Sequence, residues 1–303
     1  MRLASRLSVF INASAGTAKA QDRQALEAAL EEALSKHGLT AEINFPEGSD
    51  LAAAVKAARD SGADGIVVGG GDGTIRTAAA ALAGSDVPLG VLPLGTLNHF
   101  AKDLGLPLKL EDAIGVFAAR NIRAIDVAEV NGEIFINNSS IGIYPFLVLD
   151  RERMQEEGKQ KWHAAMLASI RALRKFPLRR LRVKVEGETI LHRTPVIFVG
   201  NNAYGLDAGT TGKRERLDRG ELSIHVAKVE SRKGFLKLVL RGMLGRLRTS
   251  TDLQVINATS AEVTSRTSRM PVALDGEVEM LEPPLRYRIR KAALKVFVPV
   301  DPA

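Results

Sequence analysis

A glycine-rich stretch decides the fold of this 303-residue chain: Val68-Gly69-Gly70-Gly71-Asp72-Gly73-Thr74. The apolar residues 65–68 precede it and the alanine-rich residues 75–82 follow it, which predicts a strand, a tight turn and the start of a helix. Consecutive glycines bring backbone N–H groups close to a ligand, and the helix N-terminus favours an anion. Asp72 would repel that anion unless a metal or a ribose hydroxyl lay between them. The stretch therefore predicts a nucleotide site with Mg²⁺, and the alternative is a turn that only joins strand to helix.

Two other phosphate motifs do not fit this stretch. The dinucleotide fingerprint Gly-x-Gly-x-x-Gly fails because Arg76 occupies the place of its third glycine. The Gly-Lys-Ser/Thr ending of a P-loop is missing as well. Any nucleotide site here must belong to another family of folds.

The composition sets outer bounds on the function. The chain is long enough for two domains, and its lack of cysteine excludes disulfides, thiolate metal sites and cysteine nucleophiles. No apolar run reaches the length of a membrane span, and the apolar residues 7–11 are too few for a signal peptide. The net charge of +7 suits an anionic partner, but only 5% aromatic residues argues against stacking of nucleic-acid bases. We expect a cytoplasmic protein.

Residues 1–125 alternate between strand and helix patterns. Strands are expected at 7–12, 41–45, 65–68 and 89–92, and helices at 21–36, 51–59, 75–82, 97–104 and 110–119. Such alternation predicts an α/β domain with a mainly parallel sheet, which binds its ligand at the carboxyl ends of the strands. The glycine turn, the loop 93–98 and residues 12–16 all fall at that edge.

Residues 126–303 follow a different pattern, that of short strands separated by turns. Asn131-Gly132 predicts a hairpin between residues 125–130 and 133–137. Further strands are expected at 181–186, 189–199, 221–229, 251–256, 261–264, 272–274, 286–289 and 294–298. This half is predicted to be a β-sandwich domain, whose last strand can return to the first domain.

Two basic segments interrupt the β half. Residues 232–248 alternate eight apolar residues with six basic ones and contain no acidic residue. A basic amphipathic helix of this kind suits an anionic membrane surface, or it covers the core with a solvated basic face. A second cluster has the same two readings, and consists of Arg171, Arg174, Lys175, Arg179, Arg180 and Arg182.

Four motifs, in this order along the chain, resemble those of the bacterial diacylglycerol kinase-like lipid kinases. They are Ile11-Asn12-Ala13-Ser14-Ala15-Gly16, Gly70-Gly71-Asp72-Gly73-Thr74, Pro93-Leu94-Gly95-Thr96-Leu97-Asn98-His99-Phe100-Ala101 and Leu274-Asp275-Gly276-Glu277. That family shares its fold with sphingosine kinases and, more distantly, with NAD kinases and phosphofructokinases. The resemblance implies an α/β nucleotide-binding domain followed by a β-sandwich that takes the lipid acceptor, and transfer of the ATP γ-phosphate to a lipid hydroxyl.

The resemblance also assigns roles to residues. Asp275 and Glu277 would be the catalytic acidic pair that handles the acceptor hydroxyl, and Asp126 matches an acidic position near the site. The ATP phosphates and ribose would be contacted by Asn12, Ala13, Ser14, Ala15, Gly16, Gly69, Gly70, Gly71, Asp72, Gly73, Thr74, Thr96 and Asn98. The chemistry fits, because a lipid hydroxyl needs a carboxylate to accept its proton, and Mg²⁺ would neutralise charge on the phosphates.

The chain departs from the family pattern in four places, one of which is a pair of residues. The structural Mg²⁺ loop corresponds to Leu217-Asp218-Arg219-Gly220, in which Arg219 replaces a ligand aspartate and disfavours a cation at Asp218, the one metal candidate. Arg76-Thr77 replaces an Asn-Glu pair after the glycine loop. Phe45 and His99 stand where a threonine and an aspartate are more common.

The expected partners follow from this reading. They are a membrane lipid substrate and an anionic membrane surface at the inner face of the membrane, where the protein would be peripheral, and an exposed sheet edge would permit a homodimer. Nucleic acid is not expected. Two alternatives remain, a soluble phosphotransferase of the NAD kinase type and a nucleotide-binding membrane module without catalysis.

Overall fold

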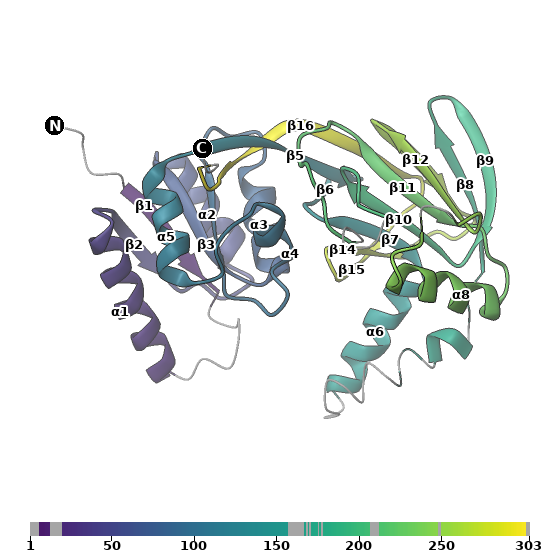
Figure 1. Ribbon diagram of the computed structural model, residues 1–303, viewed down its shortest axis with the longest axis horizontal. Helices are drawn as coiled ribbons and strands as arrows, with labels where there is room; N and C mark the ends of the chain where they lie inside the picture. The colour runs from purple at the N-terminus through teal and green to yellow at the C-terminus, as the bar shows by residue number, and fades with distance from the viewer. Residues whose placement is uncertain are drawn as a thin grey trace. The chain divides into compact units, whose positions relative to one another are not determined.

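The chain forms two compact units in the computed structural model (Figure 1). The first unit contains residues 1–127 and 291–303, and the second contains residues 128–290. The structure describes residues 6–12, 20–156, 167, 169, 171–174, 176, 178–206, 212–247 and 250–300.

A parallel sheet forms the centre of the first unit. Its strands, in spatial order, are β2 (Thr40–Asn44), β1 (Arg6–Ile11), β3 (Gly65–Gly70), β4 (Leu89–Pro93) and the end of β16 (Leu285–Phe297). All residues of β3 and β4 are buried, as expected for strands covered on both faces. The predicted α/β domain with a mainly parallel sheet is confirmed.

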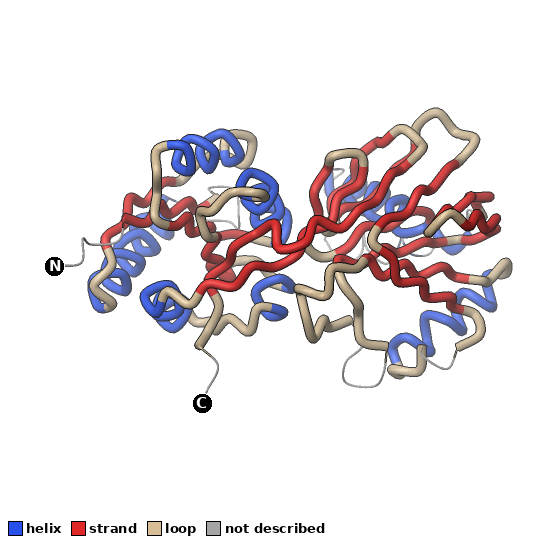
Figure 2. Tube along the Cα trace, turned by 90° about the horizontal axis from the view of Figure 1, so that it is seen from above, coloured by secondary structure: helices blue, strands red, loops and turns tan. Residues whose placement is uncertain are grey.

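Helices lie on both faces of this sheet (Figure 2). They are α1 (Ala20–Lys36), α2 (Leu51–Asp60), α3 (Asp72–Leu82), α4 (His99–Asp103) and α5 (Leu110–Ala119). Helix α2 packs against α3, and α1 packs against α5. The helix predicted from residue 97 begins only at His99, because Asn98 adopts a left-handed conformation with φ 50° that cannot continue a helix.

Two strands belong partly to each unit, β5 (Ile122–Val130) and β16. Asp126 is buried on β5, and its Oδ1 accepts a hydrogen bond from the backbone N–H of Ala292 at 2.9 Å. Ala292 has φ 48°, so β16 is locally irregular at this point. The bond holds the outgoing and the returning strand together.

The second unit is a sandwich of two sheets. One contains the start of β16, the end of β5, β6 (Glu133–Phe135), β13 (Ser260–Thr264), β8 (Arg179–Val185) and β9 (Glu188–Thr194). The other has the order β12 (Leu253–Ala258), β11 (Leu222–Ala227), β10 (Val196–Asn201), β7 (Asn138–Gly142), β14 (Met270–Leu274) and β15 (Glu277–Leu281), with all pairings antiparallel. One apolar core contains residues of both sheets, among them Ile224 and Val263. The predicted β-sandwich is confirmed.

Turn chemistry explains where the strand predictions succeed and fail. Asn131 and Gly132 have φ values of 51° and 94° and join β5 to β6 in the predicted hairpin. The single strand expected at 189–199 is two strands, because the chain breaks at Thr194-Pro195 and proline cannot donate to a ladder.

Helices α6 (Ile143–Glu156) and α8 (Arg232–Met243) lie in the second unit outside the sheets. Ser231 caps α8, since its Oγ accepts a hydrogen bond from Gly234 N–H at 3.1 Å. Neither of these helices, nor any other in the described part of the chain, is long and apolar enough to cross a membrane.

Candidate functional site

Three loops meet at the carboxyl edge of the parallel sheet, because β1, β3 and β4 are neighbours that run in the same direction. A hydrogen bond between residues 62 positions apart connects two of these loops. Asn12 follows β1, and its Nδ2 donates a hydrogen bond to Thr74 Oγ1 at 2.9 Å, while its backbone N–H donates to Gly69 O at 3.1 Å. These bonds fix the end of β1 beside the glycine turn.

The loop after β4 packs directly on the glycine turn. A Cβ atom on Gly95 would lie 2.6 Å from Gly71 Cα and 3.2 Å from Gly70 O, so only glycine fits at residue 95 without movement of the backbone. Asn98 stabilises this loop from within. Its Oδ1 accepts from Gly95 N–H at 2.9 Å, and its Nδ2 donates to Pro93 O at 3.1 Å and to Gly95 O at 2.8 Å.

Asp72 connects the same two loops through its carboxylate. Oδ2 accepts a hydrogen bond from His99 N–H at 3.3 Å, and Oδ1 accepts from Phe100 N–H at 3.2 Å. These N–H groups belong to the first turn of α4, so Asp72 acts as a cap supplied from another helix. The sequence interpretation gave Asp72 only a ligand role, and the structure adds this positioning role.

The start of α3 can receive an anion. Its N-cap is Gly71, which offers no side chain to the first N–H groups of the helix. A Cβ on Gly71 would meet no atom within 4 Å, so open space lies in front of this helix end. Thr96 is exposed in the neighbouring loop. The structure therefore brings together the described phosphate-loop candidates Asn12, Gly69–Thr74 and Asn98, whereas residues 13–16 lie outside the described part of the chain.

The second predicted cluster lies in the second unit. Asp275 and Gly276, with φ values of 51° and 95°, form the two-residue turn between β14 and β15. The Asp275 carboxylate accepts hydrogen bonds from the backbone N–H groups of residues 136, 137 and 138 at 2.8, 2.8 and 2.9 Å. The Asp275 carboxylate is thus held in a fixed orientation, and Glu277 is exposed on the next strand.

A buried arginine stabilises the same peptide segment from its carbonyl side. Arg214 donates from Nη1 to Ile136 O at 2.6 Å and to Asn201 O at 3.1 Å, and from Nη2 to Asn137 Oδ1 at 2.6 Å. Residues 136–138 therefore lie between a carboxylate that accepts from their N–H groups and a guanidinium that donates to their oxygens. The sequence analysis missed Arg214, Asn137 and Asn201, although polar residues directly after the apolar strands were a usable signal.

The two remaining candidates have structural partners. Asp126 bonds Ala292 in the first unit, as described above. Asp218 forms a two-pronged ion pair with Arg216, at 2.8 Å from Nε and 3.0 Å from Nη2. That guanidinium neutralises the carboxylate, and the described residues contain no group of three acidic or histidine side chains able to hold a metal. Asp218 therefore does not fit a structural Mg²⁺.

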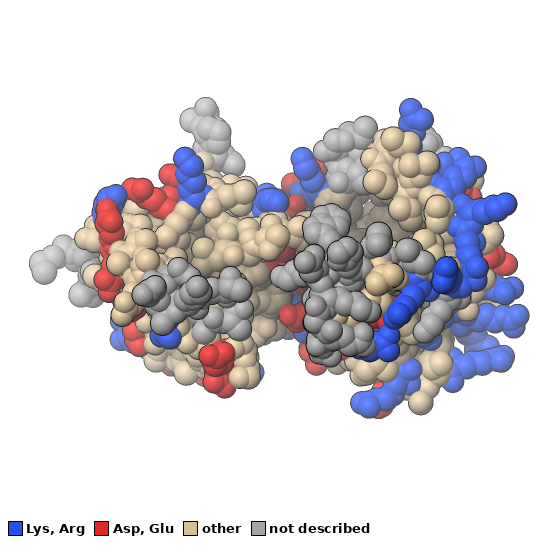
Figure 3. Space-filling model, turned by 90° about the horizontal axis from the view of Figure 1, so that it is seen from below, with Lys and Arg blue, Asp and Glu red and all other residues tan. Residues whose placement is uncertain are grey.

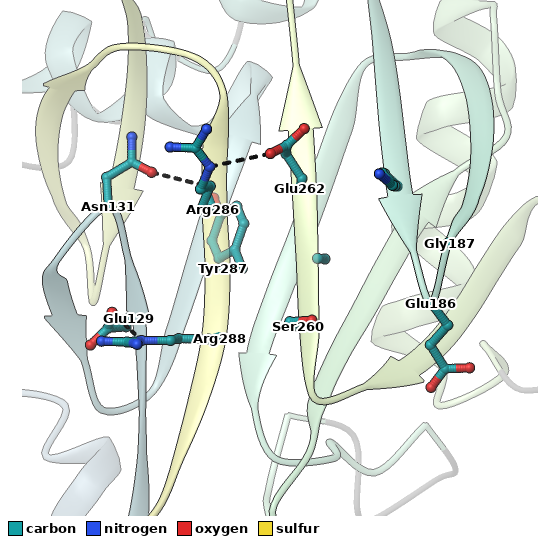
Figure 4. Close-up of a pocket in the computed structure, with 11 residues that line it drawn as sticks. Glu129, Asn131, Glu186, Gly187, Ser260, Glu262, Arg286, Tyr287 and Arg288 are labelled. Carbon is teal, nitrogen blue, oxygen red and sulfur yellow. Dashed lines mark hydrogen bonds and ion pairs between the residues drawn. The ribbon is translucent and has the colours of Figure 1, made fainter.

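Figure 4 shows a cavity of about 740 Å³ in the second unit that contains none of the predicted site residues. Four of its charged side chains form ion pairs: Arg286 lies 3.3 Å from Glu262, and Arg288 lies 2.5 Å from Glu129. Lys184 and Glu186 also line the cavity, so its lining has three basic and three acidic residues and favours neither sign of charge, and we assign no site here.

Two apolar cavities of about 340 and 420 Å³ adjoin α8 in the second unit. They share Val196, Phe235 and Val239 in their linings. His225 lines the first, where burial lowers its pKa to about 4, so this ring is neutral at physiological pH. Such cavities suit hydrocarbon rather than a charged ligand.

The fold defines a protein with an α/β unit and a β-sandwich unit, and comparisons with known proteins identify both as domains of known families. Residues 6–130 match the family described as "Diacylglycerol kinase catalytic domain", and residues 150–298 match the "YegS C-terminal NAD kinase beta sandwich-like domain". The chain therefore contains a diacylglycerol kinase catalytic domain followed by a YegS-type C-terminal domain.

Named relatives agree with this assignment. The chain is 40% identical over 114 residues to "Probable lipid kinase YegS" of Escherichia coli O6:K15:H31 (strain 536 / UPEC), and equally to that of Shigella boydii serotype 18 (strain CDC 3083-94 / BS512). Each match spans 36% of this chain and 38% of the relative.

Solved structures share the whole fold. A chain from Bacillus anthracis str. Sterne aligns with a TM-score of 0.77 at 21% identity, over 97% of both chains. Another from the same organism, described as a diacylglycerol kinase, aligns with a TM-score of 0.71 at 19% identity, also over 97% of both chains.

Proposed function

We propose that this protein is an ATP-dependent lipid kinase, which transfers the γ-phosphate of ATP to the hydroxyl group of a membrane lipid. Three features support the proposal: the glycine turn at the start of α3, the fixed Asp275 carboxylate, and the two family matches. The observation that carries it is the N-terminus of α3, which has no side-chain cap and open space at Gly71, while the loop after β4 packs on the same glycine turn through Gly95.

The first unit would hold the nucleotide. The backbone N–H groups at the start of α3 donate to phosphate oxygens, and the hydrogen bonds of Asn12 and Asn98 keep the surrounding loops in place. Bound Mg²⁺ would neutralise charge on the transferred phosphoryl group. Asp72 fits that ion, because a carboxylate that accepts two N–H bonds keeps further lone pairs for a cation held mainly by phosphates.

The second unit would supply the groups that act on the acceptor. Glu277 is exposed and carries the carboxylate that takes the hydroxyl proton. The Asp275 carboxylate already accepts three N–H hydrogen bonds, so it suits orientation of the hydroxyl better than proton uptake. This division of roles is part of the proposal.

The apolar cavities beside α8 favour a lipid over a dinucleotide acceptor. Their linings consist mainly of aliphatic and aromatic side chains such as Phe235 and Val239. A dinucleotide would need polar partners for its phosphates and sugars, which these cavities do not offer. A soluble acceptor of the NAD type is therefore the less favoured candidate.

A labelling experiment tests the proposal. Purified protein receives Mg²⁺ and γ-labelled ATP, with liposomes that contain diacylglycerol, sphingosine or ceramide, and with NAD in a separate reaction. We expect label in one lipid, and a loss of rate of about 10²–10⁴-fold in Glu277→Gln. Glu279→Gln is the matched control, because Glu279 lies two residues further along β15 on the same side of the strand.

Each other outcome contradicts a defined part of the proposal. Label in NAD alone would establish a soluble acceptor. No label in any acceptor, while calorimetry still detects bound ATP, would indicate a nucleotide-binding module without catalysis. Equal rates for Glu277→Gln and the wild type would remove the proton-acceptor role from Glu277.

A further inference from the structure

Helix α8 presents an apolar face to solvent. Leu236, Leu240, Met243 and Leu244 have exposed fractions of 54, 57, 81 and 55%. Only Leu238 is buried on this helix. An ordinary core-covering helix does the reverse and places most of its apolar residues inside.

The exposed residues form one continuous row. Residues 236, 240, 243 and 244 follow one another at intervals of four, three and one, which places them on the same side of α8 and its C-cap, Leu244. Leu238 lies on the opposite side, in a small core with Ala227 and Val229. The helix is thus anchored by its inner face, while the row on its outer face stays more than half exposed.

Positive charge surrounds this row. Arg232, Lys233 and Lys237 are exposed on α8, and the helix has no acidic residue. Neither lysine has an acidic partner within the described part of the chain. Arg241 differs, because it lies toward the protein and pairs with Asp252 at 3.1 Å.

The second basic segment of the sequence lies next to α8. Arg232 donates a hydrogen bond to the carbonyl of Arg174, and the rings of Phe235 and Phe176 pack edge to face with centroids 5.7 Å apart. Arg174 is exposed, so it adds to the charge beside the helix. Figure 3 shows Lys and Arg side chains gathered on this side of the second unit.

We propose that the outer face of α8 docks on an anionic lipid bilayer, with Leu236, Leu240, Met243 and Leu244 in the interface and the basic residues on the lipid headgroups. The partner must be both apolar and negatively charged, and a bilayer surface meets both requirements. A second copy of this chain fits poorly, because two α8 faces would bring Lys233 and Lys237 against like charges. The docking adds a partner to the proposed kinase but does not depend on it.

Vesicle binding tests the docking without any kinase reaction. The full chain is sedimented with phosphatidylcholine vesicles that contain 0 or 30% phosphatidylserine, without ATP and without an acceptor lipid. We expect binding to the anionic vesicles that weakens as salt rises. Lys233→Gln with Lys237→Gln should reduce the partition coefficient about 25-fold at low salt, since each surface lysine contributes about fivefold. Leu240→Gln with Met243→Gln should reduce it by about tenfold or more.

Matched controls separate α8 from general charge and hydrophobicity. Lys56→Gln and Leu108→Gln change an exposed lysine and an exposed leucine of the first unit, and should leave binding unchanged. All variants are checked by thermal unfolding. The proposal is overturned if the anionic vesicles do not bind the wild type, or if the α8 variants bind as well as the controls. It is overturned equally if sedimentation velocity detects a dimer that Leu240→Gln with Met243→Gln abolishes.

Discussion

Gly71→Ala separates folding from phosphate binding at the start of α3. Gly71 has φ −82° and ψ 176°, which alanine adopts without strain, and the added methyl group would meet no protein atom within 4 Å. The same methyl group would occupy the space in front of the helix N-terminus, where the proposed phosphate lies. The substitution should therefore leave the fold intact and weaken the binding of the nucleotide.

The expected change in stability is close to zero. Alanine is a poorer N-cap than glycine, which lowers the free energy of unfolding by about 0.5–1 kcal/mol. Removal of a glycine restricts the unfolded chain and raises it by about 0.4–1 kcal/mol. The two contributions oppose each other, so urea unfolding should give a value within about 0.5 kcal/mol of the wild type.

The expected change in binding is large. Displacement of a phosphate oxygen from one backbone N–H removes a hydrogen bond to a charged group, which contributes about 1.5–3 kcal/mol. The Kd for ATP, measured by titration calorimetry with Mg²⁺, should rise by about 10- to 100-fold. Gly242→Ala is the control, because a Cβ there makes only ordinary contacts with Leu247 at 3.6–3.8 Å, within α8. An unchanged Kd for ATP in Gly71→Ala would refute phosphate binding at this helix end. A large loss of stability would refute the conclusion that a methyl group at residue 71 meets no protein atom.

Three further substitutions test other parts of the structure. Gly95→Ala should lower the free energy of unfolding by about 2 kcal/mol and weaken the binding of ATP, because its Cβ would force the two loops apart. An unchanged free energy in urea unfolding and an unchanged Kd for ATP in calorimetry would contradict this. Arg214→Met should lower stability by about 3 kcal/mol in urea unfolding, since it leaves buried oxygens without donors, and a loss below 1 kcal/mol would show that water replaces the guanidinium. His225 has a folded pKa of about 4 against 6.5 unfolded, so the unfolded chain binds the proton first, and stability should fall by roughly 3 kcal/mol as the pH drops from about 6.5 to 4. When the free energy of unfolding is measured across this pH range, His225→Gln should reduce its dependence on pH, whereas a substitution of the exposed His37, His37→Gln, should not. The same pH dependence in both variants would contradict burial of His225 in the folded state.

Local patterns were sufficient to predict the fold class. Strands β1, β3 and β4 of the parallel sheet are short and mainly apolar, and each comes before a turn or loop. Asn131-Gly132 predicts its hairpin because both residues tolerate positive φ. The strand β15 escaped prediction, because Glu277 and Glu279 interrupt its apolar pattern and most of its residues are only partly buried. Asp275-Gly276 forms the turn of this hairpin, which is compatible with both readings of the motif, a surface turn at the end of a strand and a catalytic site.

The contacts within the site could not be predicted, because they join residues far apart in sequence. Asp72 meets α4 about 27 residues later, and Arg214 meets Asn137 at a separation of 77. No periodicity encodes such pairs, which depend on how strands are ordered in the sheets. The residue types alone were enough to suggest the chemistry of the site, whereas the hydrogen-bond partners of these residues depend on the topology. The division of the two domains into nucleotide-binding and acceptor halves stays a prediction.

The hydrogen bond between Asp126 and Ala292 has a consequence for how this chain can be divided. It holds the points where the chain leaves the first unit and returns to it, so the second unit is topologically an insertion within the first. Truncation after residue 127 would remove the β16 segment and expose the edge of β4. Excision of residues 128–290, with a tight turn between Val127 and Lys291, would keep that edge covered. The second unit can therefore be removed from within the first, but the chain cannot be cut once into an amino-terminal and a carboxyl-terminal domain.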